Sequence, residues 1–279
     1  MIMKKSIIIF CLAFVGLNGY SQDMNAISQQ GEFGIAAGGA QYFGDLNTRA
    51  SLARPKFSAG IFFVKQFGNY IGLKIAGNYA RLGYTDKYSL NTVQRARNLS
   101  FNTNIWEFSA SGQFNFFKFA PGDPAYAYTP YVSLGVGVFS YDPYAYLLGE
   151  KQYLRPLGTE GQGSTAYPDR VPYGSMAVCF PFSIGMKYNM TDNINVFAEI
   201  GYRFTTTDYL DDVSTTYAPD AFPNGQPEIN YLLSDRSYET GDRIGIKGRQ
   251  RGNSQQKDAY VLGQIGVSFN ISTYNCPRP

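Results

Sequence analysis

Histidine is absent from the 279 residues of this sequence. Because histidine is the commonest general base and the commonest metal ligand, its absence excludes Ser-His and Cys-His triads. The sequence also has no nucleophile elbow, no paired-thiol motif and no zinc-protease helix motif. We therefore expect a protein that is not an enzyme, with no catalytic residues, no cofactor and no metal-binding residues.

Charge is scarce. Asp, Glu, Lys and Arg make up 16% of the chain, against about 25% in ordinary soluble domains. The net charge of +3 and the lack of a basic run argue against nucleic-acid binding. The densest basic positions are Arg95, Arg97, Arg249 and Arg251, all in predicted loops. We expect these arginines to be solvated, and contact with anionic lipid headgroups is the alternative.

Long apolar runs are scarce too. The one extended run, Ile7 to Leu17, follows Lys4 and Lys5 and is about a dozen residues long, too short to span a membrane as a helix. This arrangement predicts a secretory signal peptide at residues 1–21, cleaved after Ser21, and a mature chain of residues 22–279. No other stretch approaches 18 apolar residues, so any membrane crossing must use strands.

Cysteine is rare, with three in the chain, and Cys179 and Cys276 remain after cleavage. An exported protein meets an oxidising compartment in which the two could pair. A disulfide also needs the two Cα atoms within about 7 Å, which the sequence does not establish. The pairing therefore stays open.

Aromatic residues and glycine are abundant, with 23 Tyr, 21 Phe and 30 Gly. This profile favours strands and tight bends over helices. The clearest strand pattern runs from Asn104 to Phe116, where apolar and polar residues alternate. One face carries Trp106, Phe108, Ala110, Phe114 and Phe116, and the other carries Glu107, Ser109, Ser111, Gln113 and Asn115. A period of two over this length predicts a membrane-crossing strand.

Seven further segments alternate in the same way, although Pro181 weakens one of them because proline donates no ladder hydrogen bond. The eight predicted strands are Glu32–Ala40, Lys56–Gln66, Tyr70–Gly83, Asn104–Phe116, Thr129–Tyr141, Val178–Tyr188, Ile194–Phe204 and Asp258–Ile271. Short turns alternate with long loops between them. The short turns are Phe67–Asn69, Lys118–Tyr128 and Asn189–Asn193, and the long loops are Gln41–Pro55, Tyr84–Ser100, Asp142–Pro172 and Thr205–Lys257. This organisation predicts an all-β fold, an eight-stranded antiparallel transmembrane β-barrel of the outer-membrane type.

A soluble barrel such as a lipocalin would show the same period, but the polar faces argue against it. They are rich in Gly, Ser, Asn and Gln, with isolated charges that suit a narrow lumen: Lys74, Glu107, Lys187, Glu199 and Arg203. We expect these charges to form a salt-bridge network, and an ion path or a catalytic carboxylate pair is the alternative. Tyrosines near strand ends are expected to form two interfacial girdles, namely Tyr84, Tyr126, Tyr131, Tyr141, Tyr188 and Tyr260.

Two loop motifs resemble ligand sites without matching them. Asp208, Asp211 and Asp212 could present oxygens to calcium, but the glycine and the terminal glutamate of an EF-hand loop are missing. The PLGTEGQGS segment from Pro156 has three glycines, but no lysine or helix follows to complete a phosphate cradle. We expect no metal at the first segment and a structured turn at the second.

Several segments resemble the PorG family of Bacteroidetes outer-membrane proteins. They are GGAQYFGDLN from Gly38, RPKFSAGIFF from Arg54, PYVSLGVGVFSYDPYA from Pro130, RPLGTEGQG from Arg155 and TDYLDDVSTTY from Thr207. The resemblance implies an outer-membrane component of the type IX secretion system, which also supports gliding motility in some relatives. It implies association with the periplasmic ring of a PorK-like lipoprotein and PorN-like proteins, and it brings no catalytic residues.

The expected partners are thus those ring proteins and outer-membrane lipid, without nucleic acid or a small-molecule substrate. The turn Lys118–Tyr128 and the tail Ser272–Pro279 are the segments expected to reach a periplasmic partner. Two alternatives stay open. One is a narrow outer-membrane channel or small-solute transporter, and the other is a membrane enzyme of the lipid-hydrolase or protease kind that would use Glu107 or Glu199.

Overall fold

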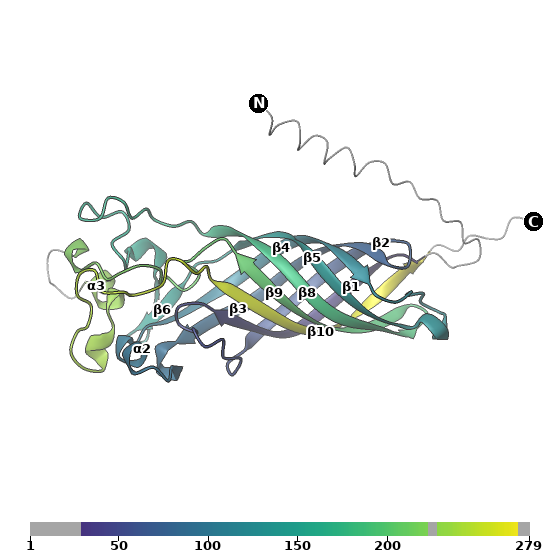
Figure 1. Cartoon of the computed structure of the whole chain (residues 1–279), viewed down its shortest axis with the longest axis horizontal. Coiled ribbons are helices and arrows are strands. Elements are labelled where there is room, and N and C mark those ends of the chain that lie inside the picture. The colour runs from purple at the N-terminus through teal and green to yellow at the C-terminus, as the bar shows by residue number, and fades with distance from the viewer. Residues whose placement is uncertain (1–28, 223–227, 273–279) are drawn as a thin grey trace, which may run out of the picture.

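Eight long antiparallel strands form a closed barrel in the computed structural model, which describes residues 29–222 and 228–272 (Figure 1). The predicted signal peptide at residues 1–21 lies outside the described residues. The barrel strands are β1 (Gln29–Phe43), β2 (Lys56–Phe67), β3 (Ile71–Thr85), β4 (Ser100–Asn115), β5 (Tyr128–Ser140), β8 (Met176–Thr191), β9 (Ile194–Thr205) and β10 (Ala259–Ser272). Each strand pairs with the next, and β10 pairs with β1 to close the ring. The predicted fold class and all eight predicted strands are confirmed.

The predicted alternation sets the orientation of the side chains. On β4, Trp106 is 65% exposed whereas its neighbour Glu107 is 3% exposed, and the same inversion runs around the barrel. Exposed Phe, Ile, Leu and Val side chains therefore cover the outer wall, and polar side chains fill the inside. A closed ring leaves no unpaired sheet edge in the hydrocarbon layer, and its apolar wall matches lipid. The protein is an integral outer-membrane β-barrel.

A short hairpin was not predicted. Strands β6 (Tyr144–Leu147) and β7 (Glu150–Tyr153) pair with each other inside the predicted loop Asp142–Pro172, and Tyr144 pairs with Asn102 of β4. The hairpin turns at Leu148 and Gly149, both with positive φ, and Leu148 is 96% exposed. Four-residue strands carry too little alternation to be recognised.

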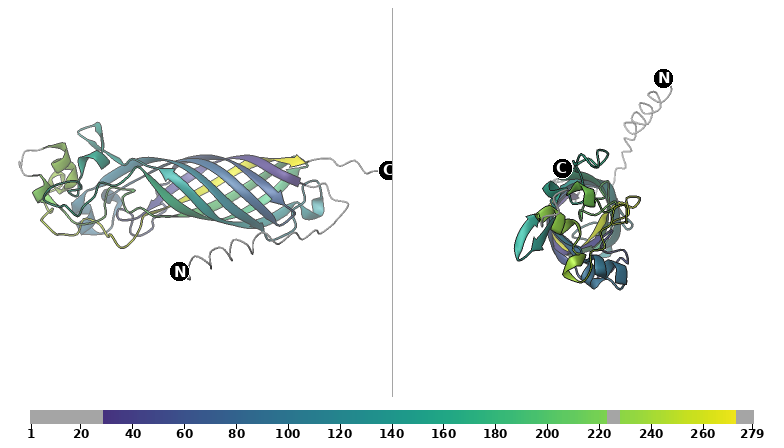
Figure 2. Two further views of the ribbon diagram at one scale, coloured as in Figure 1. Left: turned by 90° about the horizontal axis from the view of Figure 1, so that it is seen from above. Right: turned by 90° about the vertical axis from the view of Figure 1, so that its left-hand side faces the viewer.

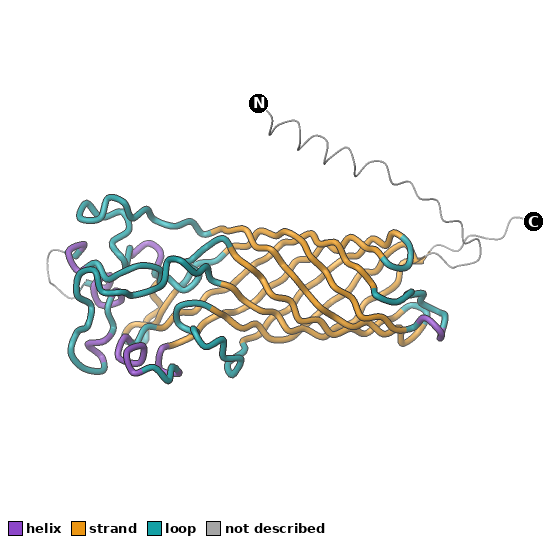
Figure 3. Tube along the Cα trace, in the orientation of Figure 1, coloured by secondary structure: helices purple, strands orange, loops and turns teal. Residues whose placement is uncertain are grey.

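The two ends of the barrel differ in the length of their connections, as predicted from the sequence. Figure 3 shows short turns at one end and, at the other, long loops that carry most of the helical turns. The helices are η1 (Asp86–Tyr88), α2 (Thr92–Arg97), η2 (Pro124–Tyr126), η3 (Arg155–Leu157), η4 (Pro219–Ala221), α3 (Ile229–Ser234) and η5 (Ser237–Glu239). No helix among the described residues is long and apolar enough to cross a membrane. We call the short-turn end periplasmic and the long-loop end extracellular, after the orientation that outer-membrane barrels generally have.

The long loops gather beyond one end of the barrel (Figure 2), and we call them the cap. Leu210, Val213 and Leu233 of the longest loop are buried in one core with Phe101 and Tyr260 at the barrel rim. The described part of the loop Thr205–Lys257 therefore packs onto the barrel rim, which the sequence alone does not establish.

Pro181 perturbs β8 as expected but does not break it. The pairing of β5 with β8 skips Gly135 and Val136, next to Pro181, whereas on the other side Pro181 still pairs with Arg203 of β9. Because proline has no N–H to donate, the hydrogen-bonded pairing is interrupted toward β5 only, and the pairing with β9 is kept.

The predicted tyrosine girdles were wrong for four residues. Tyr84, Tyr131, Tyr141 and Tyr260 are buried at inward-facing positions, whereas Tyr126 and Tyr188 are exposed near the periplasmic end. For Tyr131, Tyr141 and Tyr260 the hydroxyl explains the difference, because a buried tyrosine needs a hydrogen-bond partner and the interior offers Glu199, Thr207 and Glu107. In the extracellular half of the wall, half-buried Tyr79 packs against exposed Trp106, with ring centroids 4.8 Å apart.

Candidate functional site

The predicted salt-bridge network inside the barrel is confirmed. Lys74 Nζ lies 2.6 Å from Glu199 Oε2, and Arg203 Nε lies 3.2 Å from Glu107 Oε2. Tyr131 donates to Glu199 across 2.8 Å, and Tyr260 donates to Glu107 across 2.7 Å. The carboxylates have cation and hydroxyl partners, as buried charges require, which argues against the alternative of a catalytic pair.

A third ion pair lies in the lumen, and only one of its two residues was predicted. Lys187 Nζ contacts Glu32 Oε1, and Ser268 donates to the other carboxylate oxygen across 2.8 Å. Lys187 was among the predicted inward charges and Glu32 was not. The available signal was position, since Glu32 alternates with outward-facing Phe33 and therefore faces the lumen.

Two phenylalanines occupy the lumen between these charges. Phe62 and Phe197 pack edge to face with centroids 5.1 Å apart, and both are buried. Gly34 and Gly266 make room for them, because a Cβ at either position would overlap one of the rings. The cavity beside them measures about 20 Å³, room for about one water molecule. Side chains thus fill the middle of the barrel.

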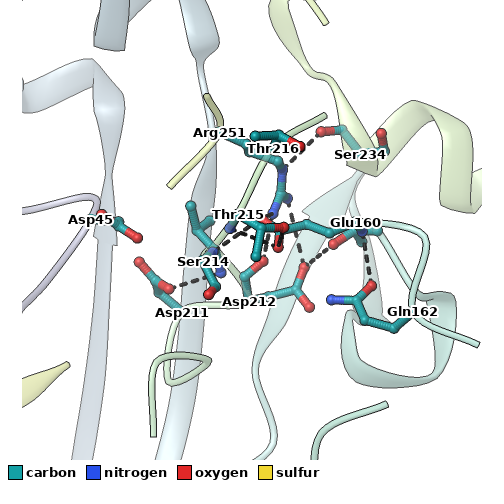
Figure 4. Close-up of polar contacts among 12 residues, drawn as sticks. Asp45, Glu160, Gln162, Asp211, Asp212, Ser214, Thr215, Thr216, Ser234 and Arg251 are labelled. Carbon is teal, nitrogen blue, oxygen red and sulfur yellow. Dashed lines mark hydrogen bonds and ion pairs between the residues drawn. The ribbon is translucent and has the colours of Figure 1, made fainter. Parts of the chain in front are cut away.

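In the cap, Arg251 is the centre of a buried polar cluster (Figure 4). Its Nη1 lies 2.9 Å from Glu160 Oε1, and its Nη2 lies 3.7 Å from Asp212 Oδ2. Glu160 also accepts backbone hydrogen bonds of 3.0 Å from Ser214 and from Thr215. The glycine-rich segment is thus a structured turn, as predicted, and its Glu160 ties that turn to the TDYLDDVST segment.

The acidic run uses its oxygens within the cap. Asp211 accepts from the Tyr42 hydroxyl and the Val213 N–H, and Asp212 accepts from Thr159 and Tyr173. Burial raises the pKa of Asp212 to about 6 even though Arg251 opposes the shift. Burial and the neighbouring Asp258 raise the pKa of Asp211 well above its ordinary value. Within the described ranges no group of three Asp, Glu or Cys side chains has the geometry of a metal site.

The prediction of solvated loop arginines was wrong for two of the four. Arg97 is buried and binds Asp86 through two nitrogens, each 2.7 Å from a carboxylate oxygen, and Arg251 is buried as described. Arg95 and Arg249 are exposed, as predicted. The buried arginines join loops that are distant in sequence, which no local pattern indicates.

Cys179 is buried inside the barrel and has no disulfide partner among residues 29–222 and 228–272. Cys276, its predicted possible partner, lies outside the described residues. Whether the two cysteines pair stays open.

The periplasmic end carries an open groove of about 730 Å³. It lies between the predicted turn Lys118–Tyr128, which contains η2, and the ends of β3, β4 and β8. The exposed aromatic and apolar side chains that line it are Tyr70, Phe116, Phe117, Tyr126, Tyr128, Tyr188 and Met190. Beside them lie Lys118, whose Nζ is 4.4 Å from the centroid of the Tyr126 ring, and Asp192.

The turn beside this groove is held in place. Asp123 caps η2 by accepting from the Ala125 N–H, and Asn189 of β8 accepts from the Gly122 N–H across 3.1 Å. Phe119 of the same turn is 1% exposed, with the Lys187 ammonium 5.3 Å from its ring centroid. The turn thus places Phe119 beside luminal Lys187 and leaves Phe117 and Tyr126 exposed.

Solved outer-membrane barrels are similar in fold. Neisserial surface protein A matches with 12% identity and a TM-score of 0.42, covering 87% of this chain and 97% of its own. OprG from Pseudomonas aeruginosa matches with 11% identity and a TM-score of 0.41, covering 89% and 100%. Ail of Yersinia pestis matches with 9% identity and a TM-score of 0.39, covering 86% and 97%.

No protein of curated function matches this sequence. One family model does match, over residues 7–226, which is most of the chain. The chain belongs to the family described as domain of unknown function DUF6089.

Proposed function

We propose that this protein is a non-enzymatic outer-membrane component of the type IX protein secretion system, which holds a periplasmic ring of PorK-like and PorN-like proteins at the outer membrane. The observation that carries the proposal is a contrast between two parts of the barrel. The lumen is filled by ion pairs and by Phe62 and Phe197, whereas the periplasmic end exposes an aromatic groove. The PorG-like segments supply the identity of the partner.

The groove has the composition of a protein-binding surface. Aromatic residues and methionine are enriched in interface cores, and Phe117, Tyr126 and Met190 are exposed there. Part of the wall belongs to the aromatic girdle that meets the headgroups, but Lys118 and Asp192 lie beyond the strand ends. A ring protein that approaches the membrane from the periplasm would meet those residues first. The tail Ser272–Pro279 lies outside the described residues except Ser272, and its part in binding stays a prediction.

Co-purification tests the proposal. A tagged chain is isolated from native outer membranes in mild detergent, and the proteins that accompany it are identified. We expect ring proteins with the wild type and a loss of at least about tenfold with Phe117→Ser/Tyr126→Ser, which removes two central aromatic anchors. The control is Tyr88→Ser/Leu90→Ser, two exposed residues at the extracellular end. Equal recovery with all three proteins, or no ring protein with the wild type after cross-linking, would contradict the proposal.

A further inference from the structure

A cluster of basic side chains lies at the extracellular edge of the membrane-facing wall. Lys56 begins β2, Arg81 is near the end of β3, and Lys151 is on β7 of the hairpin. Lys56 donates to Asn102 Oδ1 of β4, and its ammonium lies over Gly83, two residues from Arg81 on the same face of β3. The Lys151 ammonium lies 3.9 Å from the centroid of the Tyr144 ring, and Tyr144 pairs with Asn102.

These three cations have no carboxylate partner. None of them forms an ion pair with an Asp or Glu in residues 29–222 or 228–272. Glu150, the acid next in sequence to Lys151, projects from the opposite face of β7 because successive strand residues alternate. By contrast, buried Lys187 and Arg203 in the lumen and buried Arg97 and Arg251 in the cap each have a carboxylate partner. The cluster therefore brings positive charges together without compensation.

The backbone accommodates the cluster. Gly83 of β3 pairs with Asn102, and the Lys56 ammonium lies directly over it. A Cβ at this position would overlap that ammonium and approach the Phe101 carbonyl oxygen to 2.6 Å. Glycine is thus needed for Lys56 to lie between Arg81 and Asn102 rather than extend into solvent.

The level of the cluster on the wall identifies its environment. Tyr79 pairs with Trp106 and Arg81 pairs with Asn104, so Arg81 lies two residues, or about 7 Å, beyond the pair of half-buried Tyr79 and exposed Trp106. Aromatic side chains mark the boundary between hydrocarbon and headgroups, and cations just outside it meet lipid phosphates. The Tyr79 hydroxyl accepts from Arg81 Nε across 3.1 Å, which joins the aromatic and basic parts.

We propose that Lys56, Arg81 and Lys151 bind the phosphate of an anionic lipid headgroup in the outer leaflet, with Tyr79 and Trp106 contacting the lipid below it. Lys56 and Arg81 supply charge-assisted hydrogen bonds from the barrel wall, and Lys151 reaches the same phosphate from the hairpin. This site lies at the end of the barrel opposite the periplasmic groove, so it stands whether or not a ring protein binds there.

The test uses the purified full-length protein in neutral detergent, titrated with lipid A that carries phosphate and with the same lipid after enzymatic removal of its phosphates. We expect the wild type to bind the phosphorylated lipid about tenfold more tightly or better, and Lys56→Gln/Arg81→Gln to lose that preference. Arg49→Gln/Arg95→Gln makes the same charge change at two exposed loop arginines and should bind within about twofold of the wild type.

Three results would overturn the proposal. The first is equal binding of the two lipids by the wild type, which needs no variant to fold. The second is an equal loss of binding in the control variant, which would show unspecific attraction. The third is full competition by inorganic phosphate at the concentration of the lipid, which would show a site for free anions instead of headgroups. Barrel folding of each variant is checked by its heat-modifiable mobility in gels.

Discussion

Arg251 and Glu160 are separated by 91 positions in the chain, yet Nη1 of the arginine lies 2.9 Å from Oε1 of the glutamate in the buried centre of the cap. This contact joins the loop after β5 to the loop after β9. Because those loops leave different parts of the barrel rim, the pair fixes them over the mouth as one unit.

Removing the cation should therefore loosen the cap. We expect Arg251→Gln to destabilise the loops by about 3 kcal/mol, because it leaves Glu160 and Asp212 buried without a positive partner. Limited proteolysis should then cut between residues 206 and 258 while the barrel stays folded. Arg249→Gln removes an exposed guanidinium two residues away and should leave the cleavage pattern of the wild type. Equal resistance of both variants would refute this role of Arg251.

The cap should also lose stability as pH rises. Burial raises the pKa of Asp45, Asp208 and Asp212 to about 6 each, above the ordinary value of 3.8. Between about pH 4 and 6 the folded state therefore holds protons that the unfolded state has released, so the free energy of unfolding falls as pH increases through this window and stays low above it.

Hydrogen exchange of the loop amides at pH 5 and pH 8, corrected for intrinsic rates, measures this change. We expect greater protection at pH 5, and a smaller difference in Asp212→Asn, which cannot ionise. Greater protection at pH 8 would show that the sign is wrong.

Inside the barrel, removing one partner of the Arg203–Glu107 pair should lower the free energy of unfolding more than replacing both partners with uncharged residues. Arg203→Met leaves Glu107 buried without its cation and should lower the free energy of unfolding by about 3–5 kcal/mol. Arg203→Met/Glu107→Gln removes both charges and should recover part of that loss. Urea unfolding in lipid vesicles gives both values, and a double variant less stable than the single one would contradict the pairing.

The filled lumen predicts a barrel that does not conduct. Reconstituted in a planar bilayer, the wild type should show no unitary conductance steps under conditions in which a porin does, because the cavity beside Phe62 and Phe197 measures about 20 Å³. Reproducible, solute-dependent steps would revive the alternative of a narrow channel.

The eight barrel strands could be predicted because lipid on one side and a polar lumen on the other impose a period of two on every strand. That pattern is local, so Trp106 and Glu107 could be assigned to opposite faces from the sequence alone. The same parity placed the inward charges correctly. Tyr131 and Tyr260 follow the alternation as well, since both face the lumen between outward-facing neighbours, whereas the preference of tyrosine for membrane interfaces predicts a girdle position for them.

Other features depend on contacts that no local pattern encodes. The Lys187–Glu32 pair joins residues 155 positions apart, and their meeting depends on the stagger of strands around the barrel. The fold of the cap depends on pairs such as Arg251–Glu160 and Arg97–Asp86, within loops that have no period. Of the groove at the periplasmic end, the sequence indicates only that the turn Lys118–Tyr128 can reach a periplasmic partner, because the groove itself forms where this turn meets the ends of β3, β4 and β8.

Site-specific photo-cross-linking in the native organism tests the central claim most directly. A photoreactive phenylalanine analogue replaces Phe117 in the periplasmic groove or, as the matched control, Tyr88 at the extracellular end. We predict cross-links from position 117 to a PorK-like or PorN-like ring protein and none to either from position 88. Cross-links from position 117 to lipid alone, in cells where the ring is assembled, would contradict the claim that this surface holds the ring at the outer membrane.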